Sequence, residues 1–168
     1  MRTPVAALFA LSVAVGVPTS AGAQAPPSIR DVFRNALPSV AVIRAAGSKV
    51  SARTGGVSRF RETGAGVLIS DDGKVMTAAH VVHAMEQIIV EFLGSELVPA
   101  RVISSEPAAD VSIIQLERVP SAARAAPMAD SDKVAIGDHV IVVGAPHGLS
   151  YSLSAGLISA RHAPNTVY

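Results

Sequence analysis

From residue 40 onward the chain consists of short β-prone segments separated by turn residues, and this pattern limits the possible folds most strongly. Valine and isoleucine dominate these segments, as is typical of strands. The predicted strands before residue 118 are residues 40–45, 63–70, 74–78, 87–93, 98–104 and 111–116. Six short strands with little helix predict an all-β fold, in which the sheet closes into a small barrel or packs as a sandwich.

Turn residues join two of these strands. Asp71-Asp72-Gly73 lies between residues 63–70 and 74–78 and predicts a tight turn, so the two strands are expected to pair as a hairpin. Gly64 and Gly66 lie inside the first of these strands. Glycine at such positions indicates a bend or bulge at the corner of a barrel.

The region after residue 117 predicts a second, incomplete unit. Residues 118–132 are rich in alanine and proline, which is typical of a linker. Two further apolar strands are predicted at residues 139–145 and 153–160. Residues 133–168 are therefore interpreted as the start of a second β-barrel. Two strands alone leave apolar edges exposed, which natural proteins avoid, so we expect the chain to be cut off within this barrel.

The N-terminus has the pattern of a secretory signal. Arg2 precedes an apolar run over residues 5–17, and Ala21-Gly22-Ala23 is typical of a cleavage site. Residues 1–23 are therefore predicted to be a signal peptide. The apolar run is shorter than the roughly 20 residues that a bilayer requires, so no stable membrane span is expected after cleavage. An uncleaved membrane anchor is the alternative.

Residues 24–38 are predicted to form a linker and a short helix. Ser28 and Asp31 resemble a capping box, with aspartate in place of the usual glutamate or glutamine. Apolar residues recur behind them at helical spacing, which gives one apolar stripe. Pro38 then ends the helix. This pattern favours a packing helix without a chemical role.

Residues 47–61 contain glycine, serine and four cations but no acidic residue. This composition predicts a solvated, mobile surface loop between the first two strands. A regulatory loop or a loop that contacts another subunit is the alternative.

Composition excludes several classes of function. The net charge is +1, so no overall electrostatic field favours nucleic acid or an anionic surface. The chain has no cysteine, which excludes disulfides, thiol catalysis and thiolate metal sites. Export without disulfides favours the bacterial envelope, in the periplasm or secreted. Phosphate-binding loops and zinc-ligand spacings are absent from the sequence, so neither cofactor nor metal is expected.

Two residues beside apolar strands have the order of a catalytic pair. His80 follows a strand and two alanines, whose small side chains let other backbone approach closely. Asp110 precedes residues 111–116, whose burial is expected to draw the carboxylate toward the interior, where an imidazole N–H would satisfy it. Alone, His80 fits a surface or core position and Asp110 a turn. Histidine followed by aspartate, however, is the order of one serine-hydrolase triad.

The segments around both residues resemble the trypsin-like serine proteases, specifically the HtrA/Deg branch that bacteria export. Residues 64–82 are similar to the catalytic-histidine segment of that family, and residues 109–116 to its catalytic-aspartate segment. Residues 136–149 are similar to the entry into its second barrel, and residues 154–160 to the strand that follows. The resemblance extends over about residues 29–161 and implies a trypsin-like double β-barrel.

The resemblance also implies roles and partners. The first barrel would comprise residues 39–117, with His80 as the general base and Asp110 as its orienting partner. The implied activity is that of a serine endopeptidase on polypeptide substrates, namely unfolded or misfolded envelope proteins. The family also implies a trimer-based homo-oligomer and often a C-terminal PDZ domain.

The nucleophile of that family has no counterpart in the sequence. It lies in a Gly-Asn-Ser-Gly-Gly-type segment, and no Gly-x-Ser-Gly occurs here. Ser150, Ser152 and Ser154 alternate along a predicted strand upstream of that segment, so we do not interpret them as substitutes. The oxyanion hole uses backbone around the nucleophile. We therefore expect the catalytic serine beyond Tyr168 and the 168-residue chain to be inactive.

The remaining histidines give weak signals. His83 lies one helical turn from His80, but no third ligand for zinc is nearby in the sequence. His139, His147 and His162 are predicted to lie at the surface.

A non-catalytic pseudoprotease, or a polypeptide-binding module built on the same barrel, is the alternative function. The presence of both His80 and Asp110 favours the protease, because a binding module has no need of the pair.

Overall fold

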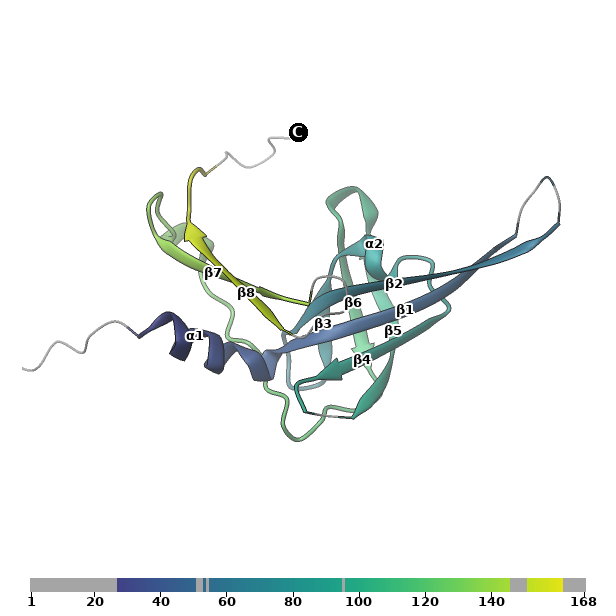
Figure 1. Ribbon diagram of the computed structural model, residues 1–168, viewed down its shortest axis with the longest axis horizontal. Helices are drawn as coiled ribbons and strands as arrows, with labels where there is room; N and C mark the ends of the chain where they lie inside the picture. Colours follow the sequence, from purple (N-terminus) through teal and green to yellow (C-terminus); the bar gives the residue numbers. More distant parts are fainter. Residues whose placement is uncertain (1–26, 51–52, 54, 95, 146–150, 162–168) are drawn as a thin grey trace, which may run out of the picture.

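The protein has a central β-barrel, from which a hairpin extends on one side, while helix α1 and a small second sheet lie on the other (Figure 1). The computed structural model describes residues 27–50, 53, 55–94, 96–145 and 151–161. The predicted signal peptide, Ser150, His147 and His162 lie outside these residues. None of the helices within the described ranges is long and apolar enough to cross a membrane.

Helix α1 (Ile29–Ala36) begins at the predicted cap. The Ser28 hydroxyl accepts a hydrogen bond from the Asp31 N–H at 3.2 Å and donates one to the Asp31 carboxylate at 2.6 Å. The first of these bonds satisfies an N–H group that has no partner within the helix. A short 3₁₀ helix, η1 (Leu37–Ser39), follows at Pro38, because proline cannot continue the α-helical hydrogen bonds. The predicted short helix is thus confirmed.

Six antiparallel strands form a closed barrel in the order β1-β2-β3-β6-β5-β4. Their bounds are β1 Val40–Val50, β2 Val57–Leu68, β3 Lys74–Thr77, β4 Gln87–Phe92, β5 Leu97–Glu106 and β6 Val111–Leu116. β1 closes the barrel because it pairs with β2 along one edge and with β4 along the other. The predicted all-β class is confirmed, and closure selects the barrel rather than the sandwich.

The core fills the interior of this barrel. Along β4 and β6 every second residue is buried, as expected for strands with one face inward. The largest fully buried apolar side chains are Phe92, Ile43, Leu68, Ile114, Val75, Val82, Val90 and Val98. Each contributes about 1.5–3 kcal/mol by leaving water, so the core fixes the positions of the loops at the barrel ends.

The prediction of a surface loop over residues 47–61 is wrong at both ends. β1 continues to Val50 and β2 begins at Val57, and the two pair without interruption from Ala46↔Arg61 to Val50↔Val57. The hairpin ladder continues beyond the barrel because antiparallel strands satisfy each other's backbone, and valine favours the extended conformation. We call residues 46–50, 53 and 55–61 the arm; Figure 1 shows that its two strands extend away from the barrel.

The two glycines in β2 allow close packing, and of the predicted bend or bulge the bulge is absent. β1 pairs with β2 through both positions without a register shift. A Cβ atom at Gly66 would lie 2.7 Å from side-chain atoms of both Ile43 and Val75. A register shift occurs instead in β5, between Val102 and Ser104.

The chain after β6 packs against the barrel. The Ala126 N–H donates a hydrogen bond to the Leu68 carbonyl at 2.8 Å, and the Arg124 N–H donates to the Pro38 carbonyl at 3.1 Å. Val119, Ala123 and Ala125 lie against the core. The segment predicted as a linker therefore also covers part of the barrel.

The second sheet has two antiparallel strands, β7 (His139–Gly144) and β8 (Ser152–Leu157). Both were predicted, but residues 158–160 are not part of β8. Backbone bonds explain this end, because the Ile158 N–H donates to the Asp138 carbonyl and the Ile158 carbonyl accepts from the Gly137 N–H. Ile158 therefore bonds to the turn before β7 instead of extending the ladder.

Candidate active site

His80 lies in α2 (Ala79–Val82), a single helical turn that follows β3 at one end of the barrel. Ala79, Val81 and Val82 are buried, which fixes the turn on the core. The His80 side chain points the other way and is 70% exposed. Gly64 permits this packing, because a Cβ atom there would lie 2.6 Å from a methyl group of Val81.

Asp110 lies between a 3₁₀ helix, η2 (Pro107–Ala109), and β6. Its backbone is left-handed, with φ 52° and ψ 40°, a conformation that aspartate tolerates better than most residues. The Asp110 N–H donates to the Pro107 carbonyl at 3.2 Å. The Asp110 side chain is 51% exposed, so the expectation that its carboxylate is drawn inward is wrong. The reason is its place in the β5–β6 connection at the barrel end.

The structure brings His80 and Asp110 into direct contact through the ring and the backbone. Nδ1 of His80 lies 2.8 Å from Oδ2 and 3.0 Å from Oδ1 of Asp110. The His80 N–H donates to Oδ1 at 2.9 Å. The Ala79 N–H donates to the Asp110 carbonyl at 3.2 Å. These bonds fix α2 and the β5–β6 connection relative to each other.

The carboxylate of Asp110 is held in its ionised form. The pKa of Asp110 is lowered from its ordinary value, first by the hydrogen bond from the His80 backbone N–H and then by the bond to the His80 ring. An ionised carboxylate only accepts hydrogen bonds, so Nδ1 is the protonated nitrogen of a neutral His80 ring. Nε2 then carries the free lone pair, and the ring can accept a proton there.

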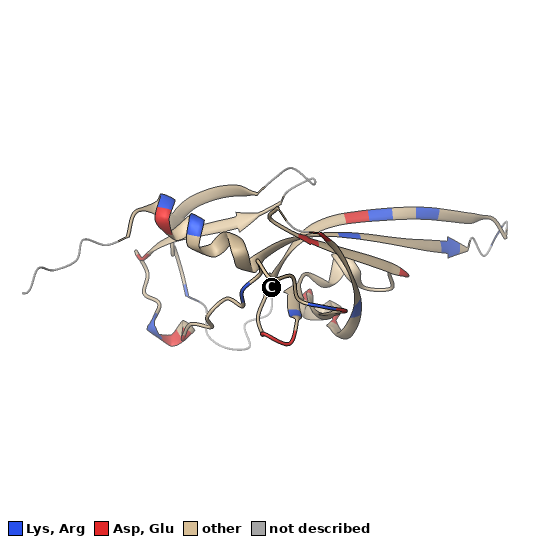
Figure 2. Cartoon of the chain, turned by 90° about the horizontal axis from the view of Figure 1, so that it is seen from below, with Lys and Arg blue, Asp and Glu red and all other residues tan. Residues whose placement is uncertain are grey.

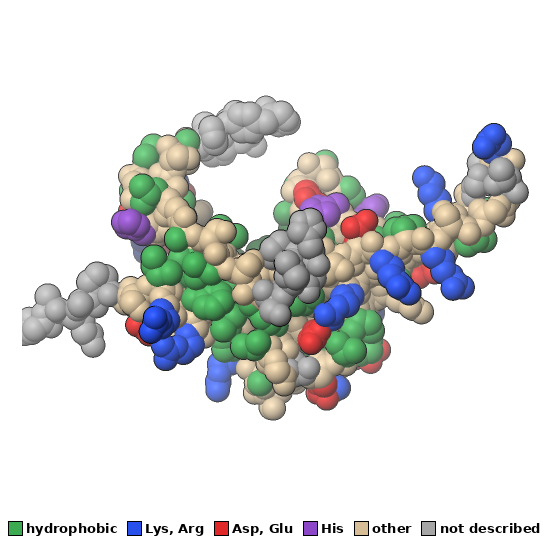
Figure 3. All heavy atoms as spheres, in the orientation of Figure 1, with side chains coloured by type: hydrophobic (Ala, Val, Ile, Leu, Met, Phe, Trp, Pro, Cys, Tyr) green, Lys and Arg blue, Asp and Glu red, His purple; other side chains and the backbone are tan. Residues whose placement is uncertain are grey.

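A hollow of about 350 Å³ lies between β2 and the second sheet. Gly64 and Ala65 line one wall, and Ser152 and Ser154 of β8 lie on the other. Figure 3 shows the surface hollowed between the β7–β8 sheet and the end of the barrel that carries α2, where histidine and acidic side chains gather. Ser152 and Ser154 are exposed in β8, and the structure describes no bond from either serine to His80.

His83, which sequence reasoning set aside, takes part in a hydrogen-bond chain. Its Nδ1 lies 3.1 Å from the Ser105 hydroxyl, which accepts a hydrogen bond from the buried Ser112 hydroxyl at 2.7 Å. Ser105 and Ser112 are paired residues of β5 and β6. The chain therefore joins α2 to the hairpin that carries Asp110. Only the tertiary structure reveals it, since the two serines have no distinctive spacing from His83.

No cluster of three or more metal-ligating side chains occurs within the ranges that the structure describes. His139 lies exposed in β7, at the predicted surface position.

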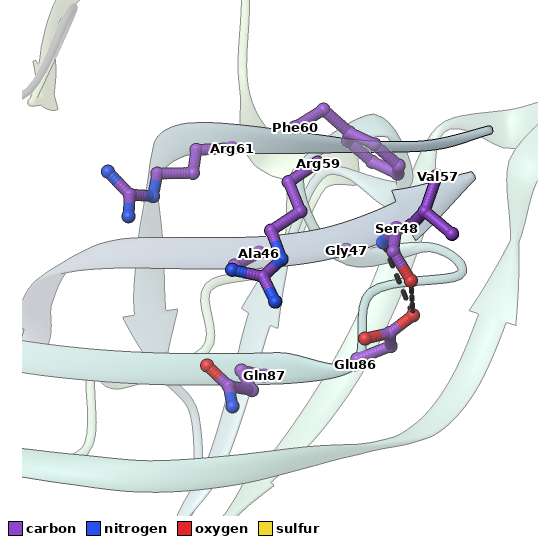
Figure 4. Close-up of a pocket in the computed structure, with 9 residues that line it drawn as sticks. All are labelled: Ala46, Gly47, Ser48, Val57, Arg59, Phe60, Arg61, Glu86 and Gln87. Carbon is purple, nitrogen blue, oxygen red and sulfur yellow. Dashed lines mark hydrogen bonds between the residues drawn. The ribbon is translucent and has the colours of Figure 1, made fainter. Parts of the chain in front are cut away.

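A second hollow, of about 690 Å³, lies beneath the arm. Figure 4 shows Arg59 and Arg61 extending from β2 over this hollow, with Glu86 and Gln87 on its opposite side. Oε1 of Glu86 accepts hydrogen bonds from the Ser48 N–H, at 3.2 Å, and from the Ser48 hydroxyl. This hollow shares no lining residue with the His80–Asp110 contact.

Comparison with known proteins gives one family. Residues 64–167 match the trypsin-like peptidase domain. A periplasmic serine endoprotease described as DegP-like, from Pseudomonas fulva, is 31% identical over 150 residues, which are 85% of this chain and 28% of the relative. A periplasmic serine protease of Haemophilus influenzae, described as do/HhoA-like, is 33% identical over 60% of this chain and 22% of its own. The chain thus spans less than a third of these curated relatives.

Solved structures share the fold. An HtrA-type protease determined with a decapeptide has a TM-score of 0.69 at 22% identity, over 80% of this chain and 47% of its own. The serine endoprotease from Yersinia pestis has a TM-score of 0.64 at 26% identity, over 82% of this chain and 46% of its own.

Proposed function

The chain belongs to the trypsin-like peptidase family, as its resemblance predicted, and we propose that the whole protein is an HtrA-type serine endopeptidase that cleaves unfolded or misfolded envelope polypeptides. Its relatives are periplasmic by name, which confirms the periplasmic location expected from the sequence. The single observation that supports catalysis most directly is the contact at 2.8 Å between Nδ1 of His80 and Oδ2 of Asp110.

His80 acts as the general base in this proposal. A serine hydroxyl attacks the substrate carbonyl carbon, and its proton moves to Nε2 of His80 as the new C–O bond forms. His80 then gives this proton to the leaving amide nitrogen as the peptide C–N bond breaks. Water hydrolyses the acyl-enzyme by the same route, which regenerates the serine. Asp110 holds the ring through Nδ1 and stabilises the charge that the ring acquires.

The serine and the oxyanion hole belong, in this proposal, to a segment beyond Tyr168. The absence of any Gly-x-Ser-Gly in the 168 residues supports this assignment, as does the greater length of the relatives. Residues 133–168 then form the start of the second barrel, residues 118–132 join it to the first barrel of residues 39–117, and residues 1–23 are the signal peptide. A trimer-based assembly completes the proposal.

Degradation of an unfolded protein by the full-length enzyme tests this function. Wild type is expected to degrade reduced casein and to react with a fluorophosphonate probe. His80→Ala should abolish both activities, whereas His139→Ala, which removes an exposed histidine from β7, should leave both unchanged. Purified residues 1–168 should remain unlabelled. A full-length protein that binds casein but neither cleaves it nor reacts with the probe would instead be a pseudoprotease.

A further inference from the structure

All four cations of the arm lack an acidic partner, whereas most of the cations in the rest of the described structure have one. Six cations outside the arm form ion pairs with carboxylates, namely Arg34, Arg44, Lys74, Arg118, Lys133 and Arg161. No described carboxylate forms an ion pair with Lys49, Arg53, Arg59 or Arg61, and all four are exposed. Although the net charge of the whole chain is only +1, the arm therefore has a local excess of positive charge.

The arm carries this charge away from the barrel. Figure 2 shows that Lys and Arg positions occur along the protruding hairpin, on the opposite side of the barrel from α1. Arg59 and Arg61 alternate along β2 and share one face, while Lys49 lies on the opposite face of β1. The positive charge thus surrounds the arm and is not collected in one groove.

An apolar pair lies on the same face as the two β2 arginines. Val50 and Val57 are directly opposite each other in the ladder, and they are 64% and 66% exposed. Because strand residues alternate between faces, Val57 shares the face of Arg59 and Arg61. This face therefore combines two exposed valines at its outer end with two unpaired arginines nearer the barrel.

We propose that the arm binds the surface of an anionic phospholipid bilayer. Arg59 and Arg61 contact lipid phosphates, and Val50 and Val57 enter the region between headgroups and acyl chains, as in other interfacial elements. The periplasmic location gives the protein access to membranes. The proposal is independent of the protease assignment, because it uses neither His80 nor Asp110.

The surroundings of the arm favour a lipid surface over an acidic polypeptide. Glu86 places a negative charge in the hollow beneath the arm, which disfavours the entry of any anionic group there (Figure 4). A planar surface instead meets Val50 and Val57, the last pair of the described ladder, on the part of the hairpin that extends beyond the barrel (Figure 1). It also uses the exposed valines, for which an acidic ligand has no need.

Vesicle sedimentation with the full-length protein tests the proposal. The vesicles contain phosphatidylcholine with about 30% phosphatidylglycerol, or phosphatidylcholine alone. Wild type should bind the anionic vesicles preferentially, and raising NaCl from about 50 to 500 mM should release it. Each arginine near an anionic leaflet contributes about fivefold, so the double variant Arg59→Gln/Arg61→Gln should bind about 25-fold more weakly.

A matched control separates the arm from total charge. Arg30 and Arg101 are exposed, lie outside the arm and form no ion pair with the described carboxylates, so Arg30→Gln/Arg101→Gln removes the same charge and should bind nearly as wild type. Val50→Ser/Val57→Ser should weaken binding about tenfold without changing the net charge.

Three results would overturn the proposal. One is equal binding of wild type to anionic and neutral vesicles, and another is equal loss of binding in the arm and control variants. In the third, the wild type binds soluble polyglutamate but not the vesicles, and Arg59→Gln/Arg61→Gln loses the polyglutamate binding. This result would identify an acidic polypeptide as the ligand of the arm. Casein degradation, measured in parallel, should be unchanged in all variants, so failure here leaves the protease proposal intact.

Discussion

The barrel and the β7–β8 sheet contain similarly apolar strands, but only the barrel buries them. In β1 the residues Val40 to Ile43 are all buried, whereas Val142 of β7 is 66% exposed and Leu157 of β8 is 55% exposed. Every residue of β8 is exposed. The difference shows that an apolar strand pattern alone does not produce a core. The core requires closure, which supplies each strand with neighbours on both edges and a common interior.

The same difference governs the candidate active site. Backbone and side-chain bonds join His80 to Asp110 at the end of the closed barrel. The β7–β8 sheet contributes Val142, Gly144, Ser152 and Ser154 to the nearby hollow, and none of these residues has a described bond to His80 or Asp110. Changes in the barrel should therefore have large effects and matched changes in the second sheet small ones.

The largest difference is expected in catalysis. Asp110→Asn should lower kcat/KM for casein about 10⁴-fold in the full-length enzyme, because the asparagine no longer selects the Nδ1-protonated ring or stabilises its charge. Ser154→Ala, in the wall of the hollow between β2 and the second sheet, should change kcat/KM less than twofold. Steady-state kinetics of both variants provides the measurement. A large loss of kcat/KM in Ser154→Ala would mean that β8 takes part in catalysis, which contradicts the expected difference between the two regions.

The next largest difference between the barrel and the second sheet is expected in stability, when a large apolar side chain is shortened. Phe92 is 1% exposed inside the barrel, so Phe92→Ala should reduce the free energy of unfolding by about 3–5 kcal/mol. Leu157→Ala, at an exposed position in β8, should reduce it by less than about 0.5 kcal/mol. Urea unfolding followed by circular dichroism compares them. Similar losses would mean that β8 is buried in the folded protein.

The sequence predicted the barrel well because its signals there are local. The alternation in β6 gave both ends of that strand correctly, and Asp71-Asp72-Gly73 formed the expected turn, with Gly73 at φ +92°. The arm was missed, since the glycine and arginine of residues 47–61 are typical of loops. Its ladder of backbone bonds follows from strand pairing and leaves little trace in side-chain composition.

The candidate site was only partly predictable. The order of His80 and Asp110 identified the two residues, but not the left-handed backbone of Asp110 or its bond from the His80 N–H. Both depend on how η2 lies against α2, a tertiary contact. The half-exposed carboxylate was also missed, because burial of β6 says little about the connection before it.

Substitution of one glycine in the barrel and one in β8 should give a smaller difference in stability. In Gly66→Ala the new methyl group would lie 2.7 Å from side chains of Ile43 and Val75, so overpacking should cost about 1–3 kcal/mol. Gly156→Ala in β8 meets no atom within 4 Å and should be neutral or stabilising by up to about 1 kcal/mol, since alanine restricts the unfolded chain. Urea midpoints measure both. A stable Gly66→Ala protein would show that the barrel interior adjusts more readily than its packing suggests.

The smallest expected effect is the pH dependence of Asp110. Hydrogen bonds from the His80 backbone and ring lower the pKa of this carboxyl, so the folded state releases its proton more readily than the unfolded state. Its stabilising contribution is therefore complete above the ordinary carboxyl pKa of about 3.9, and it is lost as the pH falls through the lower folded-state value. The difference in urea midpoint between wild type and Asp110→Asn should stay constant above about pH 5 and shrink below pH 4.

Asp132→Asn, which removes an exposed ion pair with Arg161, should show no such change, because exposed pairs contribute little. A difference for Asp110→Asn that does not vary with pH would mean that its carboxylate gains nothing from His80 on folding. The pair at the barrel end would then be held no more firmly than the exposed Asp132–Arg161 pair beside the second sheet.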